Sequence, residues 1–128
     1  MSITTVLFDL DGTLLPMDQD VFVKAYFGRL AKKLAPYGYE AESLIAGIWK
    51  GTAAMVKNDG SCTNEAAFWN CFCGLMGADC RKDEPVFDAY YRQEFQQVQQ
   101  VCGFAPQAGQ VIKRCKAMGC RVVLATNP

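Results

Sequence analysis

The sequence predicts a mixed α/β protein in which a helical domain is inserted between two parallel strands. Two short apolar segments, residues 3–8 and 121–126, are rich in β-branched residues and have the length of buried strands. A helical segment directly precedes the second apolar segment, and this order favours two parallel strands joined by a crossover connection. The connection of roughly 110 residues is far longer than a crossover needs. We therefore expect residues 17–101 to form a helical insert, and residues 1–16 and 102–128 to form the α/β part.

Length and composition are those of an ordinary globular protein. The chain has 128 residues, of which 51% are hydrophobic and 20% are charged, so it can bury a core. Its 13 basic and 13 acidic residues balance and form no basic cluster, so we expect no nucleic-acid partner and no membrane partner. No apolar run reaches the roughly 20 residues of a membrane span, and the first residues lack the pattern of a signal peptide. We therefore predict a cytoplasmic location.

Helical periodicity predicts five helices between the strands. The first four begin near Asp18, Glu40, Thr63 and Pro85, each followed by apolar residues at helical spacing; Asp18 is expected to be an N-cap and Pro85 to lie in a first turn. A fifth, short amphipathic helix is expected over residues 108–118. The aromatic residues along the insert are expected to form its core; they include Phe68, Trp69, Phe72, Phe87, Tyr90, Tyr91 and Phe95.

Cysteine and histidine usage limits the chemistry that the chain can perform. Seven cysteines, no CxxC pair and no histidine argue against a zinc site and against a complete disulfide framework. We expect the cysteines to be mostly small buried residues in a reducing compartment. Because histidine is absent, acid–base chemistry must use carboxylates, lysine, tyrosine or cysteine.

Two acidic residues follow the first predicted strand. In an extended segment residues two apart point the same way, so Asp9 and Asp11 share a face while Leu10 points into the core. Gly12 permits a positive φ, which lets backbone N–H groups turn toward an incoming anion. The segment therefore combines two carboxylates with free backbone donors.

The second predicted strand brings further polar groups to the same edge of the sheet. It ends in Thr126, which offers a hydroxyl, and Asn127 adds a backbone N–H. Carboxylates are the hard oxygen ligands that Mg²⁺ prefers, and Mg²⁺ typically binds one or two of them together with a substrate phosphate. The sequence therefore predicts a site for phosphate and Mg²⁺ at this edge.

The two strand segments together resemble the haloacid dehalogenase (HAD) superfamily, whose members are mostly phosphatases. Its first motif, hhhDxDGT, is matched by VLFDLDGT at residues 6–13, and its second, an apolar strand ending in Thr or Ser, by RVVLAT at residues 121–126. The resemblance implies a partial Rossmann-like core with two parallel strands. It also implies that the insert is an all-helical cap of about four helices, placed directly after the first motif.

The resemblance also implies roles for individual residues. Asp9 would attack phosphorus and form an aspartyl-phosphate, while Asp11 would protonate the leaving oxygen and then activate water. The metal would be Mg²⁺, held by the Asp9 carboxylate and the Asp11 backbone carbonyl. The residues expected to bind the substrate phosphate are Asp11, Gly12, Thr126 and Asn127, and Thr13 is expected to support the loop.

The predicted function is Mg²⁺-dependent hydrolysis of a small phosphorylated metabolite. Family members carry a lysine and an acidic pair downstream of the second motif, and the 128 residues end before such positions. We therefore expect a truncated chain with impaired activity, which self-associates through the exposed surface of its small sheet. Two alternatives stay open: a phosphomutase of the same superfamily, and a non-catalytic fragment that binds phosphate or Mg²⁺ or serves assembly.

Overall fold

The structure, a computed structural model, describes residues 2–127 and divides them into two compact units. One unit combines the residues up to Lys24 with Val98–Asn127, and the other consists of Ala25–Gln97. The predicted α/β class is confirmed, because a two-stranded parallel sheet accompanies a chain that is otherwise mostly helical. That one unit is a HAD-type core and the other a cap stays a prediction.

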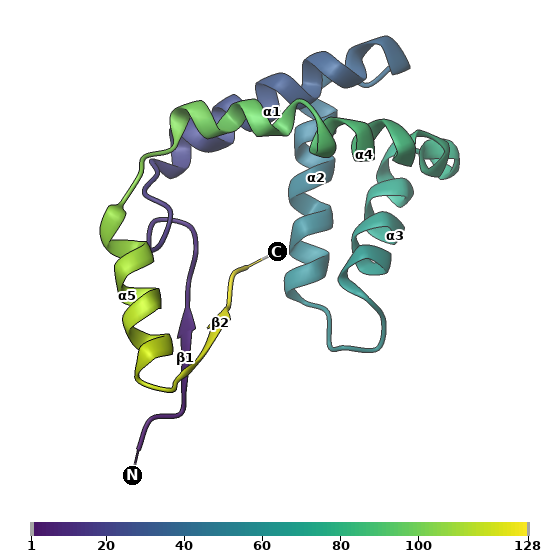
Figure 1. Ribbon diagram of the computed structural model, residues 1–128. Helices are drawn as coiled ribbons and strands as arrows, with labels where there is room; N and C mark the ends of the chain where they lie inside the picture. The colour runs from purple at the N-terminus through teal and green to yellow at the C-terminus, as the bar shows by residue number, and fades with distance from the viewer. Residues whose placement is uncertain (1, 128) are drawn as a thin grey trace. The chain divides into compact units, whose positions relative to one another are not determined.

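The first unit contains the sheet. Strands β1 (Thr5–Phe8) and β2 (Arg121–Leu124) are parallel and in register along their whole length, first residue opposite first and last opposite last. Helix α5 (Pro106–Ala117) precedes β2 and lies beside the strands (Figure 1). Gly119 follows this helix with a φ of +80°, as expected of a glycine at a helix C-terminus. The predicted parallel pairing is therefore confirmed, with strands shorter than predicted.

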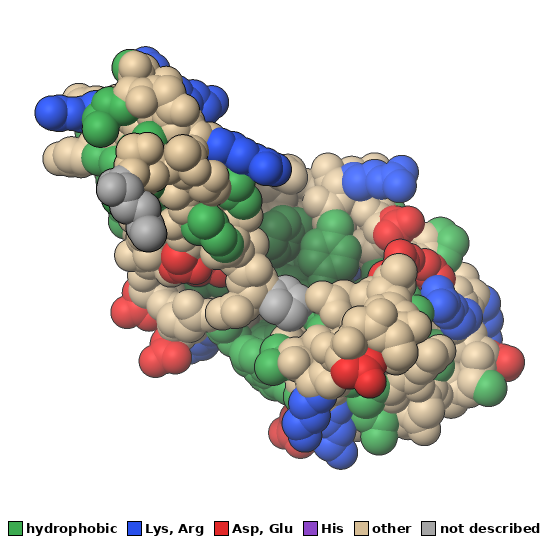
Figure 2. Space-filling view, turned by 90° about the horizontal axis from the view of Figure 1, so that it is seen from below, with side chains coloured by type: hydrophobic (Ala, Val, Ile, Leu, Met, Phe, Trp, Pro, Cys, Tyr) green, Lys and Arg blue, Asp and Glu red, His purple; other side chains and the backbone are tan. Residues whose placement is uncertain are grey.

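Both faces of this sheet are covered only in part. On one face Phe8 and Val122 are half-buried, but Leu124 is 53% exposed. On the other face Val123 is half-buried, but Leu7 is 63% exposed. Hydrophobic side chains also reach the surface between charged ones in the face of the molecule shown in Figure 2. Since parallel sheets are normally buried on both faces, the exposed leucines leave apolar surface for further packing.

The second unit is helical, and its helices begin where the sequence predicts. Glu40 accepts hydrogen bonds from two backbone N–H groups in the first turn of its helix, and Thr63 Oγ1 accepts one from Ala66 N–H at 3.1 Å. None of the helices within residues 2–127 has the length and hydropathy of a membrane span. The helical elements before α5 are α1 (Gln19–Leu34), η1 (Ala35–Tyr37), α2 (Ala41–Val56), α3 (Asn64–Met76), η2 (Ala78–Asp83), α4 (Glu84–Arg92) and η3 (Phe95–Val101). Of these, α1 and η3 each have residues in both units.

Aromatic rings fill the core of the helical unit. Trp69, Phe72, Phe87 and Tyr90 are buried, and the ring of Phe87 lies edge-to-face with Trp69 at 5.3 Å between centroids and with Phe72 at 5.7 Å. The predicted aromatic core is confirmed for these four residues. Tyr91 was also expected there, but its side chain is 42% exposed.

Close packing of α2 against α3 depends on two glycines four residues apart. A Cβ atom on Gly51 would lie 2.5 Å from Cδ2 of Phe68, and one on Gly47 would lie 2.6 Å from Cε of Met76. Positions four apart share one face of a helix, so both glycines face α3. The absence of their side chains leaves the space that the large residues of α3 occupy.

The cysteines differ from expectation. Cys73 and Cys80 form a disulfide, with Cα atoms 5.5 Å apart. Of the five free cysteines, Cys62 is exposed and the other four are half-buried. The prediction that the cysteines are mostly buried is therefore wrong. The pair forms because the chain reverses at Gly77, with a φ of +108°, and brings η2 back onto the end of α3. A spacing of seven residues matches no short cysteine motif, so this disulfide could not be inferred from the sequence.

Candidate active site at the carboxyl ends of the strands

The parallel pairing places Asp9 and Thr126 at one edge of the sheet. The hydrogen-bond ladder continues one residue beyond the strands, because the Phe8 carbonyl accepts a bond from Ala125 N–H at 2.8 Å. Continuing the register places Asp9 opposite Ala125, one position before Thr126. Residues from the two ends of the chain thus meet at the carboxyl ends of parallel strands, where α/β sheets bind their ligands.

A tight loop follows Asp9. The carbonyl of Leu10 accepts hydrogen bonds from Thr13 N–H at 3.1 Å and from Leu15 N–H at 2.9 Å. Gly12 has a φ of +75°, so the predicted left-handed conformation is confirmed. The Gly12 N–H donates to the Leu15 carbonyl at 2.9 Å. This amide, which the sequence assigns to phosphate binding, is therefore engaged within the loop.

The acidic side chains lie as the alternation predicts. Asp9 and Asp11 are exposed, and Leu10 between them is half-buried. The hydroxyl of Thr13 donates a hydrogen bond to Asp9 Oδ2 at 2.9 Å. One oxygen of the Asp9 carboxylate is therefore held by the loop, while Oδ1 is left for other partners.

Three hydrogen-bond donors near the acids are available to an anion. Within residues 2–127 no hydrogen-bond partner is found for the backbone N–H of Asp11, the hydroxyl of Thr126 or the backbone N–H of Asn127. All three residues are exposed. Backbone N–H groups and hydroxyls of this kind are the donors that hold phosphoryl oxygens in proteins.

The loop supplies some of the oxygen ligands that a single Mg²⁺ needs. Asp9 and Asp11 supply exposed carboxylates and Asp11 a backbone carbonyl, all of them hard oxygen donors. Among the described residues, no group of three or more His, Cys, Asp or Glu side chains is placed to hold a metal ion. The donor set suits Mg²⁺ because this ion retains several waters and needs only one or two carboxylates beside a substrate phosphate.

Comparisons with known proteins found no relative from which a function could be assigned. No protein-family model, no curated protein and no solved structure matches the chain. The function is therefore argued from the geometry and chemistry of the loop.

A pocket in the helical unit was not predicted from the sequence. It has a volume of about 380 Å³ and lies between the chain that leads into α2 and the segment η2. Its lining includes Tyr39, Glu40, Asp79, Cys80, Lys82 and Asp83. The sequence signals only a helix break at residues 36–39, and it gives no sign that η2 folds back toward this break.

Proposed function

We propose that this chain carries the nucleophile and the phosphate-binding loop of a Mg²⁺-dependent phosphomonoester hydrolase of the HAD type. The observation that carries the proposal is the placement of Asp9 and Asp11 on one tight loop, at the edge where β2 delivers Thr126. A carboxylate nucleophile, a second carboxyl group for proton transfer and unengaged donors for an anion are the parts that phosphoryl transfer through an acyl phosphate needs. The substrate is proposed to be a small phosphorylated metabolite.

The hydrogen bond from Thr13 assigns different tasks to the two oxygens of Asp9. Oδ2 accepts the hydroxyl proton of Thr13, so Oδ1 is the oxygen that attacks phosphorus. The new Oδ1–P bond forms as the bond from phosphorus to the ester oxygen breaks, and the Asp11 carboxyl group gives its proton to the departing alkoxide. Asp11, now a carboxylate, takes a proton from the water that attacks phosphorus. This second step releases inorganic phosphate and restores Asp9.

The negative charge on the phosphoryl group would be stabilised by hydrogen-bond donors of this chain and by a bound cation. The Asp11 N–H, the Thr126 hydroxyl and the Asn127 N–H are proposed to donate to the phosphoryl oxygens. Mg²⁺ would be held by the Asp9 carboxylate and the Asp11 carbonyl, and when bound it neutralises phosphoryl charge. Gly12 contributes its backbone conformation, and its amide would join the phosphate contacts only if its bond to Leu15 opened.

The test measures both turnover and the covalent intermediate. Purified chain is incubated with a panel of phosphomonoesters, with and without Mg²⁺, and free phosphate is measured. In parallel, acetyl phosphate serves as phosphoryl donor, and mass spectrometry locates any added phosphoryl group. We expect phosphorylation at Asp9 that Asp9→Asn abolishes, whereas Asp11→Asn allows phosphorylation and slows the release of phosphate.

The matched control is Asp20→Asn, which removes an exposed carboxylate from the same unit at the start of α1. It should leave phosphorylation unchanged. Phosphorylation that persists in Asp9→Asn would contradict the assigned nucleophile. Product analysis separates the related alternatives, because a phosphomutase yields an isomerised sugar phosphate and a non-catalytic module binds phosphate without turnover.

A further inference from the structure

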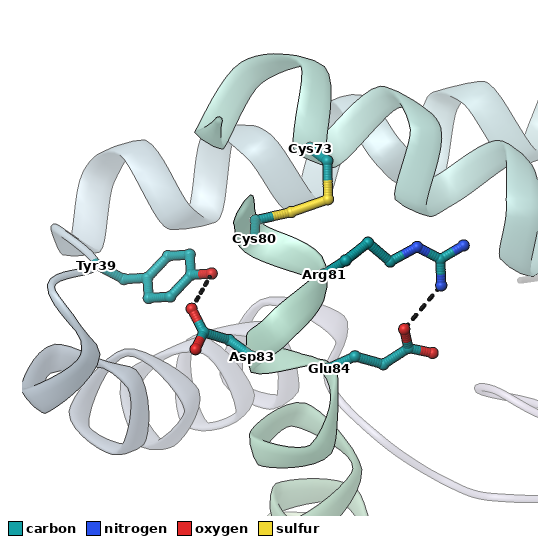
Figure 3. The surroundings of a disulfide bond; sticks show 6 residues. All are labelled: Tyr39, Cys73, Cys80, Arg81, Asp83 and Glu84. Atoms are coloured by element: carbon teal, nitrogen blue, oxygen red, sulfur yellow. Dashed lines mark hydrogen bonds and ion pairs between the residues drawn. A yellow bond between two sulfur atoms is a disulfide. The ribbon is translucent and has the colours of Figure 1, made fainter. Parts of the chain in front are cut away.

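The segment η2 is attached covalently to the helix before it. The disulfide joins Cys80, within η2, to Cys73, in the last turn of α3 (Figure 3). Only six residues long, η2 is a 3₁₀ helix, a form with poorer hydrogen-bond geometry than an α-helix. Its position must therefore depend on ties to its surroundings.

Three non-covalent contacts complete those ties. The hydroxyl of Tyr39 donates a hydrogen bond to Asp83 Oδ2 at 3.0 Å, which joins the end of η2 to the chain before α2 (Figure 3). The guanidinium of Arg81 lies 5.5 Å from the ring centroid of Trp69 and forms an ion pair with Glu84 at 2.7 Å. These contacts are partly exposed and weaker than a covalent bond, so the disulfide is the strongest of the four ties.

The same segment forms one wall of the pocket in the helical unit. Asp79, Cys80, Lys82 and Asp83 of η2 line this cavity of about 380 Å³, opposite the chain that contains Tyr39. A shift of η2 must therefore change the volume and lining of the pocket. The four aromatic rings of the core, Trp69, Phe72, Phe87 and Tyr90, belong to α3 and α4, and η2 adds Cys80 to the buried residues, so most of the core lies outside η2.

We propose that Cys73 and Cys80 form a thiol–disulfide switch that holds the pocket wall when oxidised and releases it when reduced. The side chain of Cys80 is 4% exposed and Cys73 is half-buried, so an external thiolate reaches Sγ of Cys73 first. That attack breaks the Cys73–Cys80 bond, forms a mixed disulfide on Cys73 and releases Cys80 as a thiolate that takes up a proton. The second thiol of a dithiol reductant then displaces Cys73, so two electrons and two protons pass to the protein and the reductant leaves as a disulfide.

The short span of the cross-link is consistent with a reversible role. A disulfide that closes a loop of few residues removes little entropy from the unfolded chain, so its loss costs less global stability than the loss of a long-range bridge. Reduction should therefore loosen η2 locally and leave the helical unit folded. Local opening of this kind is measured by the exchange of backbone amides with solvent.

The experiment reads the position of η2 in both redox states. The full chain carries the substitution Trp49→Phe, so Trp69 is its single tryptophan. Trp69 contacts Arg81 of η2 and therefore reports on the position of η2. The protein is titrated with dithiothreitol and reoxidised, while Trp69 fluorescence and amide exchange of residues 78–83 are followed. We expect both signals to change reversibly at one midpoint, with exchange faster by about tenfold or more and far-ultraviolet circular dichroism unchanged.

Cysteine and tyrosine variants make the test specific. Cys73→Ser should show the reduced behaviour under all conditions, whereas Cys71→Ser, which removes a free thiol from the same helix, should respond like the parent chain. Tyr39→Phe removes the second tie, so it should accelerate exchange of residues 78–83 more in the reduced chain than in the oxidised one. Equal acceleration in both states would contradict the proposal.

Three further results would overturn it. The first is mass spectrometry that finds both thiols free after air oxidation. The second is complete reduction that leaves exchange of residues 78–83 unchanged. The third is loss of the helical circular dichroism signal together with the disulfide, because the bond would then support the whole unit and would not act on the pocket wall alone.

Discussion

The hydroxyl of Thr13 donates a hydrogen bond of 2.9 Å to Oδ2 of Asp9. This bond spans the loop across four residues and fixes one of the two carboxylate oxygens of the proposed nucleophile. A carboxylate that is free to rotate would present either oxygen to phosphorus in many orientations. The contact therefore gives Thr13 a positioning role, in addition to any effect on the stability of the loop.

Removing the Thr13 hydroxyl should slow phosphorylation of Asp9. Thr13→Val keeps the branched shape and loses the donor, and misplacement of a reacting group can reduce a rate by about a hundredfold. We expect a rate between about tenfold and a hundredfold lower, measured as aspartyl-phosphate formed from acetyl phosphate. Thr13→Ser retains the hydroxyl and should stay close to the parent rate. Equal rates in Thr13→Val and the parent would show that the hydrogen bond has no positioning role.

A side chain at Gly12 should destabilise the loop through backbone strain alone. The φ of +75° is unfavourable for other residues, yet a Cβ atom there would meet no atom within 4 Å. Gly12→Ala should therefore lower the free energy of unfolding by about 1–2 kcal/mol, the cost of a left-handed residue. Gly109→Ala in α5, where a Cβ atom also meets nothing, is the control and should raise it by about 0.5–1 kcal/mol. Urea unfolding measures both values, and equal effects would contradict the strain argument.

Packing of α2 against α3 should not tolerate a methyl group at Gly51. The added Cβ atom would lie 2.5 Å from the Phe68 ring, which must then move within a packed interface. Gly51→Ala should destabilise the helical unit by about 1–3 kcal/mol, the usual range for overpacking. Gly74→Ala, in α3 and facing open space, should be neutral or stabilising. A higher melting temperature in Gly51→Ala than in Gly74→Ala would contradict this packing.

Local rules predict the helices and strands because each depends on neighbouring residues. Asp18 caps its helix as expected, since Oδ1 accepts a hydrogen bond from Val21 N–H at 3.0 Å, and the β-branched residues of both end segments pair in a parallel sheet. The conformation of Gly12 also follows from its own chemistry. The residues of the candidate site could therefore be placed at one sheet edge from the sequence, whereas the chemical roles proposed for them come from the resemblance.

Features that depend on how segments fold back on one another were missed. The Cys73–Cys80 bond requires the reversal at Gly77, and the pocket requires η2 to approach the chain before α2. The Gly12 amide was expected to face an anion, but the return of the chain to Leu15 engages it. In each case a tertiary or loop-closing contact, which has no periodic signal in the sequence, decides the outcome.

Alkaline conditions should destabilise the helical unit in part through Tyr39. Desolvation, followed by the hydrogen bond to Asp83, raises the pKa of Tyr39 to about 12. An unfolded chain releases this proton near pH 10, so the folded state binds more protons between pH 10 and 12. The contribution is complete below about pH 10 and is lost as the pH rises through about 12. Tyr39→Phe should therefore show a smaller loss of stability over this interval in urea unfolding, and Tyr37→Phe, at an exposed neighbour, is the control. Identical slopes in Tyr39→Phe and the parent chain would contradict this account.

Exposed apolar residues of the small sheet should make the chain self-associate. Leu7 is 63% exposed, and a two-stranded parallel sheet presents unpaired edges beside it. Sedimentation equilibrium should give an average mass that rises with protein concentration, and Leu7→Lys should reduce this rise because a charge on that face must be desolvated on association. Val56→Lys, at a site 68% exposed at the end of α2, controls for added charge and should associate like the parent. A parent chain that stays monomeric at every concentration, or equal effects of the two lysines, would contradict association through the sheet.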